Sequence, residues 1–263
     1  MFLADPPRTQ YDLIFTLVGV PVRVHPLFWL VGLVFGYGGV PPDKPALLVA
    51  WLAVFFVSIL VHEMGHALTM RYYGWNPSVT LYAMGGFARY DGGFTANFSS
   101  YQRKGNREFA QLIISAAGPA AGFLVAGLTV LVARLLGGNV QFDVGLRSLV
   151  TWQITQIDDN LQFMMNCFLL VNIYWGLLNL LPVYPLDGGQ ISRELFTRYS
   201  VGDGIQRSLW LSIATGAGLA AYGLSHGAFY MGLLFAYLAF SSYQLLQSYT
   251  GGGFGGFGGR NPW

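Results

Sequence analysis

The chain has 263 residues, of which 54% are hydrophobic and only 10% are charged. Soluble domains carry about 25% charged residues, so this composition excludes an ordinary soluble domain and indicates a membrane protein. The net charge of +2 is too small to indicate a nucleic-acid partner, and a single cysteine excludes an intrachain disulfide framework.

The N-terminal part of the chain is not a continuous apolar helix. It begins "MFLADPPRTQYD", with two prolines and two aspartates and no apolar core, so we expect no cleaved signal peptide. The segment "YDLIFTLVGVPVRVH" that follows, and "PSVTLYAMGGFARY" further along, are rich in β-branched residues. They predict short membrane-associated strands near the N-terminus and at 79–90.

Six apolar runs predict about six transmembrane helices. They lie at roughly 24–40, 46–70, 109–136, 161–181, 207–225 and 227–248. The predicted fold is therefore an all-α polytopic membrane protein with a few short strands. We expect one domain, residues 1–249, followed by a flexible tail rich in glycine and phenylalanine, residues 250–263.

The basic residues predict how the helices are oriented in the membrane. If the N-terminus is cytoplasmic and all six runs cross, three basic residues fall outside: Lys44, Arg134 and Arg147. The other eleven fall on the cytoplasmic side: Arg8, Arg23, Arg71, Arg89, Arg103, Lys104, Arg107, Arg193, Arg198, Arg207 and Arg260. This asymmetry follows the positive-inside rule and predicts that both termini are cytoplasmic.

The second apolar run contains "HEMGH", in which His62 and His66 are four residues apart and Glu63 lies between them. On a helix this spacing places both imidazoles on one face, where they can bind one zinc ion with Glu63 beside it as general base. The alternative is a pair of core histidines with Glu63 paired to a cation. That span contains no lysine or arginine before Arg71 to act as the cation, and ionised residues inside a membrane are functional candidates.

A catalytic zinc site needs a third protein ligand, and Asp187 is the best candidate. It follows the apolar "YWGLLNLLPVYPL", in which Pro182 and Pro185 break the helix so that an aspartate can turn inward. Glu108 and Glu194 lie instead among basic residues that can pair with them. The charge-based orientation places the two histidines and Asp187 in the cytoplasmic leaflet, which supports this choice.

These motifs together resemble the site-2 protease family of intramembrane zinc metalloproteases. "HEMGH" is followed at the family's spacing by "NLLPVYPLDGGQI" at 179–191, and "SAAGPAAG" at 115–122 is similar to the family's glycine–proline segment. "VRVHPLFW" at 22–29 and "LYAMGGFARY" at 81–90 resemble its N-terminal segment and its membrane-associated strand. We therefore expect a minimal member, without a PDZ or a CBS domain, in a prokaryotic cell membrane.

The resemblance implies the role of each matching residue. His62, His66 and Asp187 would bind one zinc ion per chain, and Glu63 would be the catalytic base of a zinc metalloendopeptidase. Asn179 matches a family asparagine that orients substrate or stabilises the oxyanion, and the alternative role for it is an interhelical hydrogen bond. The strand at 79–90, with Gly85 and Gly86, is expected to pair with an extended substrate segment.

The expected partners are transmembrane protein substrates and the lipid bilayer, and a homo-oligomer is left open. Gly118, Gly122 and Ala126 form a stripe of small residues, which predicts close helix packing. Three other functions can be weighed: a transporter, a non-catalytic membrane binder, and a CAAX-processing metalloprotease with Glu194 as a ligand. The charged residues cluster at one depth and the catalytic set is complete, which favours the protease.

Overall fold

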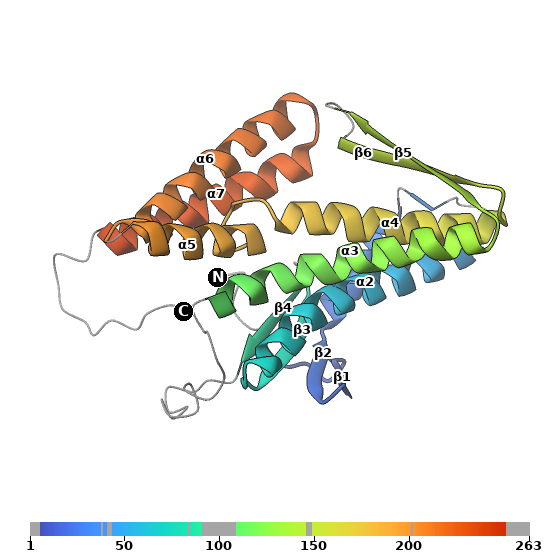
Figure 1. Ribbon diagram of the computed structural model, residues 1–263, viewed down its shortest axis with the longest axis horizontal. Coiled ribbons are helices and arrows are strands. Elements are labelled where there is room, and N and C mark those ends of the chain that lie inside the picture. Colours follow the sequence, from blue (N-terminus) through green and yellow to red (C-terminus); the bar gives the residue numbers. More distant parts are fainter. Residues whose placement is uncertain are drawn as a thin grey trace. The chain divides into compact units, whose positions relative to one another are not determined.

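The computed structural model describes residues 6–37, 39–40, 44–83, 85–90, 109–145, 149–200 and 202–250. The helices and strands in these residues are β1 (Leu13–Leu17), β2 (Val20–Val24), α1 (Pro26–Tyr37), α2 (Ala46–Tyr72), β3 (Pro77–Tyr82), β4 (Gly85–Tyr90), α3 (Ala110–Leu135), β5 (Asn139–Gly145), β6 (Leu149–Thr155), α4 (Asp159–Asn179), α5 (Asp187–Tyr199), α6 (Gly204–Ser225) and α7 (Phe229–Thr250). They form two compact units, residues 1–178 and 179–263, which are described separately (Figure 1). The expected tail, from residue 251 onward, lies outside the described residues, as does segment 91–108.

The mostly helical architecture with a few short strands is confirmed, but the number of membrane helices differs from the prediction. Within the described residues, four helices are long and apolar enough to cross a membrane: α2, α3, α4 and α7. The first apolar run folds as α1, which has only 12 residues. The run at 207–225 folds as α6, whose 22 residues include glutamine, arginine, serines and glycines that lower its hydropathy. Both were predicted as spans.

Four strands of the first unit form one sheet in the order β1-β2-β3-β4. β1 and β2 are a hairpin, β2 pairs in parallel with β3, and β3 pairs antiparallel with β4. The predicted strands near the N-terminus and at 79–90 are therefore confirmed. β4 is the last strand of the sheet, and its contacts with α2 bring it beside the helix that carries the histidines.

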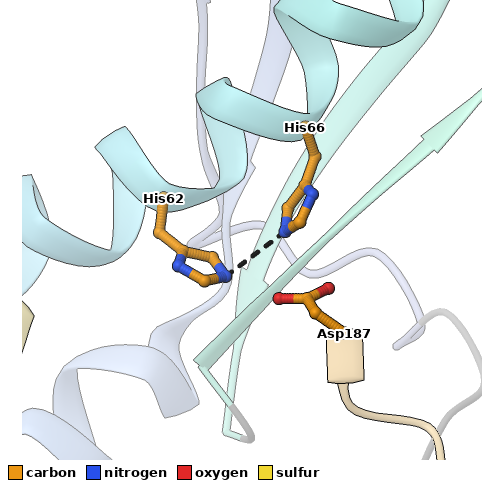
Figure 2. Close-up of side chains that lie close together, drawn as sticks. All are labelled: His62, His66 and Asp187. Atoms are coloured by element: carbon orange, nitrogen blue, oxygen red, sulfur yellow. Dashed lines mark hydrogen bonds between the residues drawn. The ribbon is translucent and has the colours of Figure 1, made fainter. Parts of the chain in front are cut away.

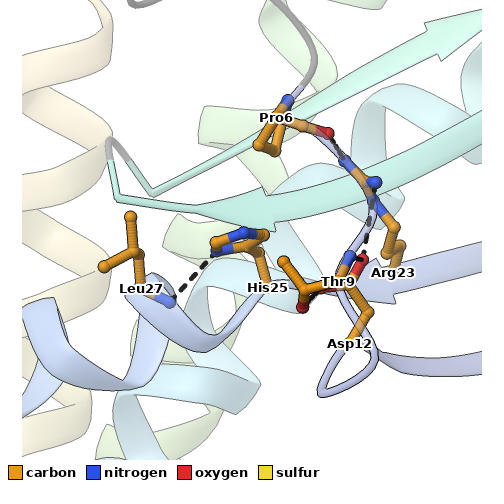
Figure 3. Close-up of polar contacts among 6 residues, drawn as sticks. All are labelled: Pro6, Thr9, Asp12, Arg23, His25 and Leu27. Carbon is orange, nitrogen blue, oxygen red and sulfur yellow. Dashed lines mark hydrogen bonds and ion pairs between the residues drawn. The ribbon is translucent and has the colours of Figure 1, made fainter.

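A polar network holds the segment before β1 against β2 (Figure 3). The Arg23 guanidinium donates to the Pro6 carbonyl at 2.9 Å and lies 3.5 Å from the Asp12 carboxylate. Thr9 donates to Asp12 from its hydroxyl at 2.7 Å and from its amide at 3.2 Å. The Thr9 hydroxyl, ahead of its amide and Arg23, lowers the pKa of Asp12. Figure 3 also shows the Leu27 amide donating to Nδ1 of His25, at 3.2 Å, at the start of α1.

The rest of the first unit is built on α2, α3 and α4. The larger core joins β2 and β3 to α1, α2 and α4 around Phe28, Ile59 and Leu81. A second core joins α3 and α4 to a hairpin of β5 and β6, and its buried residues include Ile154 and Leu169. No strand was predicted from the sequence in this segment, and the hairpin is the main element that was missed.

In the second unit, α6 and α7 form an antiparallel pair with closely packed axes. Gly216 permits this approach, because a Cβ at this position would lie 3.1 Å from the Ala239 Cβ. Ser208, Ser212 and Ser242 are buried, and each hydroxyl donates to a backbone carbonyl of its own helix. Buried hydroxyls satisfied in this way are compatible with a membrane interior.

Candidate metal centre and catalytic site

The two histidines of the HExxH motif lie on one face of α2, one helical turn apart. Figure 2 shows their rings turned so that the two Nε2 atoms face each other, and these atoms are 3.3 Å apart. Both side chains are buried, with exposed fractions of 3% for His62 and 7% for His66. Two buried imidazoles whose Nε2 atoms point to the same place can bind one metal ion.

The separation of the two Nε2 atoms fits zinc. With Zn–N bonds of about 2.0–2.1 Å and a tetrahedral angle, two nitrogen ligands lie about 3.3–3.4 Å apart. The value of 3.3 Å between His62 and His66 falls in this range. The pair therefore needs little rearrangement to hold the ion.

A backbone carbonyl of α3 fixes the ring of His66. Nδ1 of His66 lies 2.7 Å from the carbonyl oxygen of Ile114. Because a carbonyl only accepts hydrogen bonds, Nδ1 carries the proton and Nε2 is left as the basic nitrogen. A second contact comes one turn later on α3, where the ring lies directly against Gly118: a Cβ there would overlap Nε2 and lie 2.5 Å from Cε1.

Glu63 lies between the histidines in the sequence and beside β4 in the structure. It is buried, with 4% of its surface exposed. A Cβ on Gly86 would lie 2.6 Å from Cγ of Glu63, so only a glycine lets this strand approach the carboxylate so closely. The first unit thus brings together His62, Glu63, His66 and Gly86.

Asp187 and Asn179 belong to the second unit. Asn179 is the last residue of α4, and Asp187 is the first residue of α5 and is buried. The two glycines after Asp187 allow α5 to start against the preceding turn, since a Cβ on Gly188 would lie 2.5 Å from the Leu181 carbonyl oxygen. The prolines end α4 as expected, whereas the helix α5 that follows was not predicted.

Comparison with known proteins identifies the family. Residues 50–220 match the sequence profile of peptidase family M50. The chain belongs to this family. The matched region contains the HExxH helix, the Gly118 segment and the Asp187 motif.

Individual M50 relatives agree with this membership. The chain is 25% identical over 186 residues to a zinc metalloprotease of Methanocaldococcus jannaschii, covering 70% of this chain and 45% of that protein. It is 27% identical over 185 residues to stage IV sporulation protein FB of Bacillus subtilis, covering 67% and 48%. The chain thus spans about half the length of the curated relatives it matches.

A solved structure shares the fold of this M50 chain. The site-2 protease from Methanocaldococcus jannaschii aligns with a TM-score of 0.54 at 20% identity, covering 89% of this chain and 94% of that one. The resemblance to the site-2 proteases that the motifs indicated is therefore confirmed.

Three contributors to the site of this M50 chain were not identified from the sequence. The Ile114 carbonyl orients His66, and Gly118, expected only to pack helices, makes room for that ring. Asn172 donates to the Ser58 hydroxyl at 2.9 Å, which ties α4 to α2 one turn before His62. The stripe of small residues was the available signal for Gly118, whereas no sequence pattern marks a particular carbonyl.

Proposed function

We propose that this protein is an intramembrane zinc metalloprotease of the site-2 type, which hydrolyses peptide bonds in or near transmembrane segments of membrane proteins. The observation that carries the proposal is the buried His62–Glu63–His66 cluster on α2, a helix able to cross a membrane. Two imidazoles at zinc-ligand separation and a buried carboxylate beside them are the parts that metal-assisted peptide hydrolysis requires. Residues 1–249 act as the catalytic domain in this proposal.

The proposed zinc ligands are His62, His66 and Asp187, with one ion per chain. The donor set of two imidazoles and one carboxylate is of the kind that holds catalytic zinc and leaves a fourth position for water. Asp187, drawn with the histidines in Figure 2, is buried, and a buried carboxylate is stabilised by a cation. The names of the curated relatives also refer to zinc.

Glu63 is proposed to move the protons of the reaction. When bound, zinc would lower the pKa of water toward about 7 and polarise the scissile carbonyl. Glu63 takes a proton from the attacking water and passes it to the departing amine. Its burial excludes bulk water, and Gly86 of β4 packs directly against its side chain.

The substrate is proposed to lie along β4. A transmembrane helix hides its carbonyls in hydrogen bonds, so the segment to be cut has to be extended first. β4 is the last strand of its sheet, and an extended chain can add to such an edge. Gly85 and Gly86 at the start of β4 are proposed to contact the substrate, and Gly86 lies against the side chain of Glu63. Asn179 is proposed to orient the substrate or donate to the oxyanion.

The proposed orientation puts both termini in the cytoplasm and the site in the cytoplasmic leaflet, on the strength of eleven basic residues against three. Reporter fusions are expected to place segment 71–107 and the C-terminus inside and segment 137–160 outside. An external 71–107 segment would reverse the orientation and move the site to the other leaflet.

The proposed activity is tested with purified protein and a panel of single-span membrane substrates in reconstituted bilayers. We expect cleavage within or next to the membrane segment of at least one substrate, and the products are identified by mass spectrometry. A zinc chelator should abolish cleavage, and added zinc should restore it. Cleavage that persists in chelated protein, after metal analysis shows the zinc is gone, would contradict a zinc protease.

A further inference from the structure

The first unit contains a cleft of about 740 Å³ that the proposed chemistry does not use. We call it the β6 cleft. It is lined by β6, by one side of α4, and by the end of α1 together with Trp51 of α2. Figure 1 shows the β5–β6 hairpin leaving the end of α3 and folding back along α4.

The edge of a strand, rather than one face of it, lines the β6 cleft. All six residues from Val150 to Thr155 contribute to the lining. Side chains alternate between the two faces of a strand, so one face alone would supply only every second residue. β6 pairs with β5 on one edge, and no other strand of the described residues pairs with its second edge.

The hydrogen-bond pattern shows which backbone groups point into the cleft. Tyr174 of α4 donates from its hydroxyl to the Val150 carbonyl at 2.8 Å, so that carbonyl is directed away from β5. In an antiparallel pair, the amide and carbonyl of one residue both face the partner strand, and those of the next residue both face away from it. The amides and carbonyls of Trp152 and Ile154 are therefore on the same edge as the Val150 carbonyl.

If α4 crosses the membrane as proposed, this edge enters the bilayer from the outer side. Tyr174 is 15 residues after Asp159, the first residue of α4, and α4 is one of the helices able to cross a membrane. Because Tyr174 contacts Val150 of β6, the hairpin runs beside α4 over these 15 residues, which is about 22 Å at a rise of 1.5 Å per residue. Backbone groups at such depth cannot face lipid, because hydrocarbon offers no hydrogen bonds. They need a polar partner.

The C-terminal part of α4 connects the lining of the cleft to the proposed catalytic strand. Next to Tyr174, Trp175 packs its ring against Gly85, where a Cβ would lie 2.6 Å from Cη2. Gly85 is the first residue of β4, and Gly86 touches Glu63. Two neighbouring residues of α4 thus join the β6 cleft to the strand beside the catalytic base.

We infer that the β6 cleft binds an extended segment of the substrate, which adds to β6 as a third strand and continues toward β4. This inference rests on the proposed function. An extended peptide supplies the amides and carbonyls that the edge at Trp152 and Ile154 requires. A lipid chain offers neither, and a helical segment has already used its own.

The inference is tested by disulfide cross-linking to a substrate that the protein cleaves. The protein carries Glu63→Gln to retain the substrate and Cys167→Ser to remove the native thiol, which lines the cleft. Gln153→Cys on β6 is compared with Gln141→Cys, since these two residues are direct partners across the hairpin, both exposed, and only Gln153 lines the cleft. In a strand added to β6, the residue opposite position 153 would form a non-hydrogen-bonded pair with it, with Cβ atoms about 4.5 Å apart, at the upper end of the range for a disulfide.

Single cysteines placed along the substrate are expected to cross-link to Gln153→Cys at every second position, and at least about tenfold less to Gln141→Cys. A repeat of three to four positions would mean that a helix occupies the cleft. No cross-link at position 153 would mean that lipid occupies it. Either result would overturn the inference.

A second variant keeps Glu63 and narrows the cleft. Leu170→Trp, at an exposed position of the lining, should raise KM about tenfold without changing zinc content, as expected for lost substrate binding. Leu124→Trp, at an exposed position of α3 outside the lining, should leave KM unchanged. If both variants cleave the substrate with equal KM and a chelator stops the cleavage, the inference is overturned but the proposed protease stands. If no zinc-dependent cleavage is seen at all, the result counts against the protease itself.

Discussion

Replacing Gly118 by alanine is expected to abolish or strongly weaken zinc binding, although this residue is not itself a ligand. The added methyl group would overlap the His66 ring, 2.5 Å from Cε1 and closer still to Nε2. The ring cannot turn away without breaking the hydrogen bond from Nδ1 to the Ile114 carbonyl, one turn earlier on the same helix. Losing such an orienting contact costs roughly 10–100-fold in metal affinity, and direct displacement of a ligand should cost at least the upper value.

The helices cannot move apart cheaply to relieve this overlap. A Cβ on Gly65 of α2 would already lie 2.5 Å from the Ala117 carbonyl oxygen, so α2 and α3 are in close backbone contact next to His66. Zinc per chain, measured by mass spectrometry during titration with a competing chelator, gives the affinity. Gly127→Ala is the matched control, because it lies on the same helix and its Cβ would meet no atom within 4 Å.

Gly127→Ala should bind zinc like the unmodified protein, which separates the overlap at His66 from any general effect of alanine on α3. Circular dichroism and size-exclusion chromatography should show that both variants are folded. Unchanged zinc affinity in folded Gly118→Ala would mean that His66 does not bind the metal through Nε2 in this ring position.

The contrast between Glu63 and Gly118 shows what the sequence could and could not predict. HExxH is a local pattern on one helix, so its spacing alone was sufficient to predict that the two imidazoles share a face. The role of Gly118 depends on how α2 crosses α3, which no local pattern encodes. The Ile114 carbonyl is harder still to predict, because every residue has one.

The helices and strands outside the site were likewise predicted only in part from the sequence. Strands were predicted from β-branched residues in the two segments that form β1–β2 and β3–β4, without individual bounds. The ends of α2, α3 and α4 were predicted from length and hydropathy to within about two residues. The hairpin at 139–155 was missed, although "NVQFDVG" and "LVTWQIT" contain β-branched and aromatic residues. It lies between the apolar runs at 109–136 and 161–181, and no strand was predicted there. α5 was missed because its polar residues were considered only as possible ligands.

Replacing Glu63 by glutamine is expected to abolish cleavage while zinc stays bound. The amide keeps the size of the side chain and its place beside Gly86, but it cannot accept the proton of the attacking water. Loss of a general base typically costs 10²–10⁴-fold in rate. Because His62 and His66 remain in position, with their Nε2 atoms 3.3 Å apart, the metal content should be unchanged.

The Glu63→Gln protein should therefore retain substrates uncut, and the substrate should co-purify with it in detergent. Glu194→Gln is the matched control, since it also removes a carboxylate, one that pairs with Arg198 on α5 at 3.1 Å. That exchange should leave both zinc content and cleavage close to normal, because a half-exposed ion pair of this kind contributes at most about 1 kcal/mol. Near-normal cleavage by zinc-loaded Glu63→Gln would contradict the role of Glu63 as base. Loss of zinc in this variant would instead mean that Glu63 is a ligand, and the HExxH motif would need a different assignment.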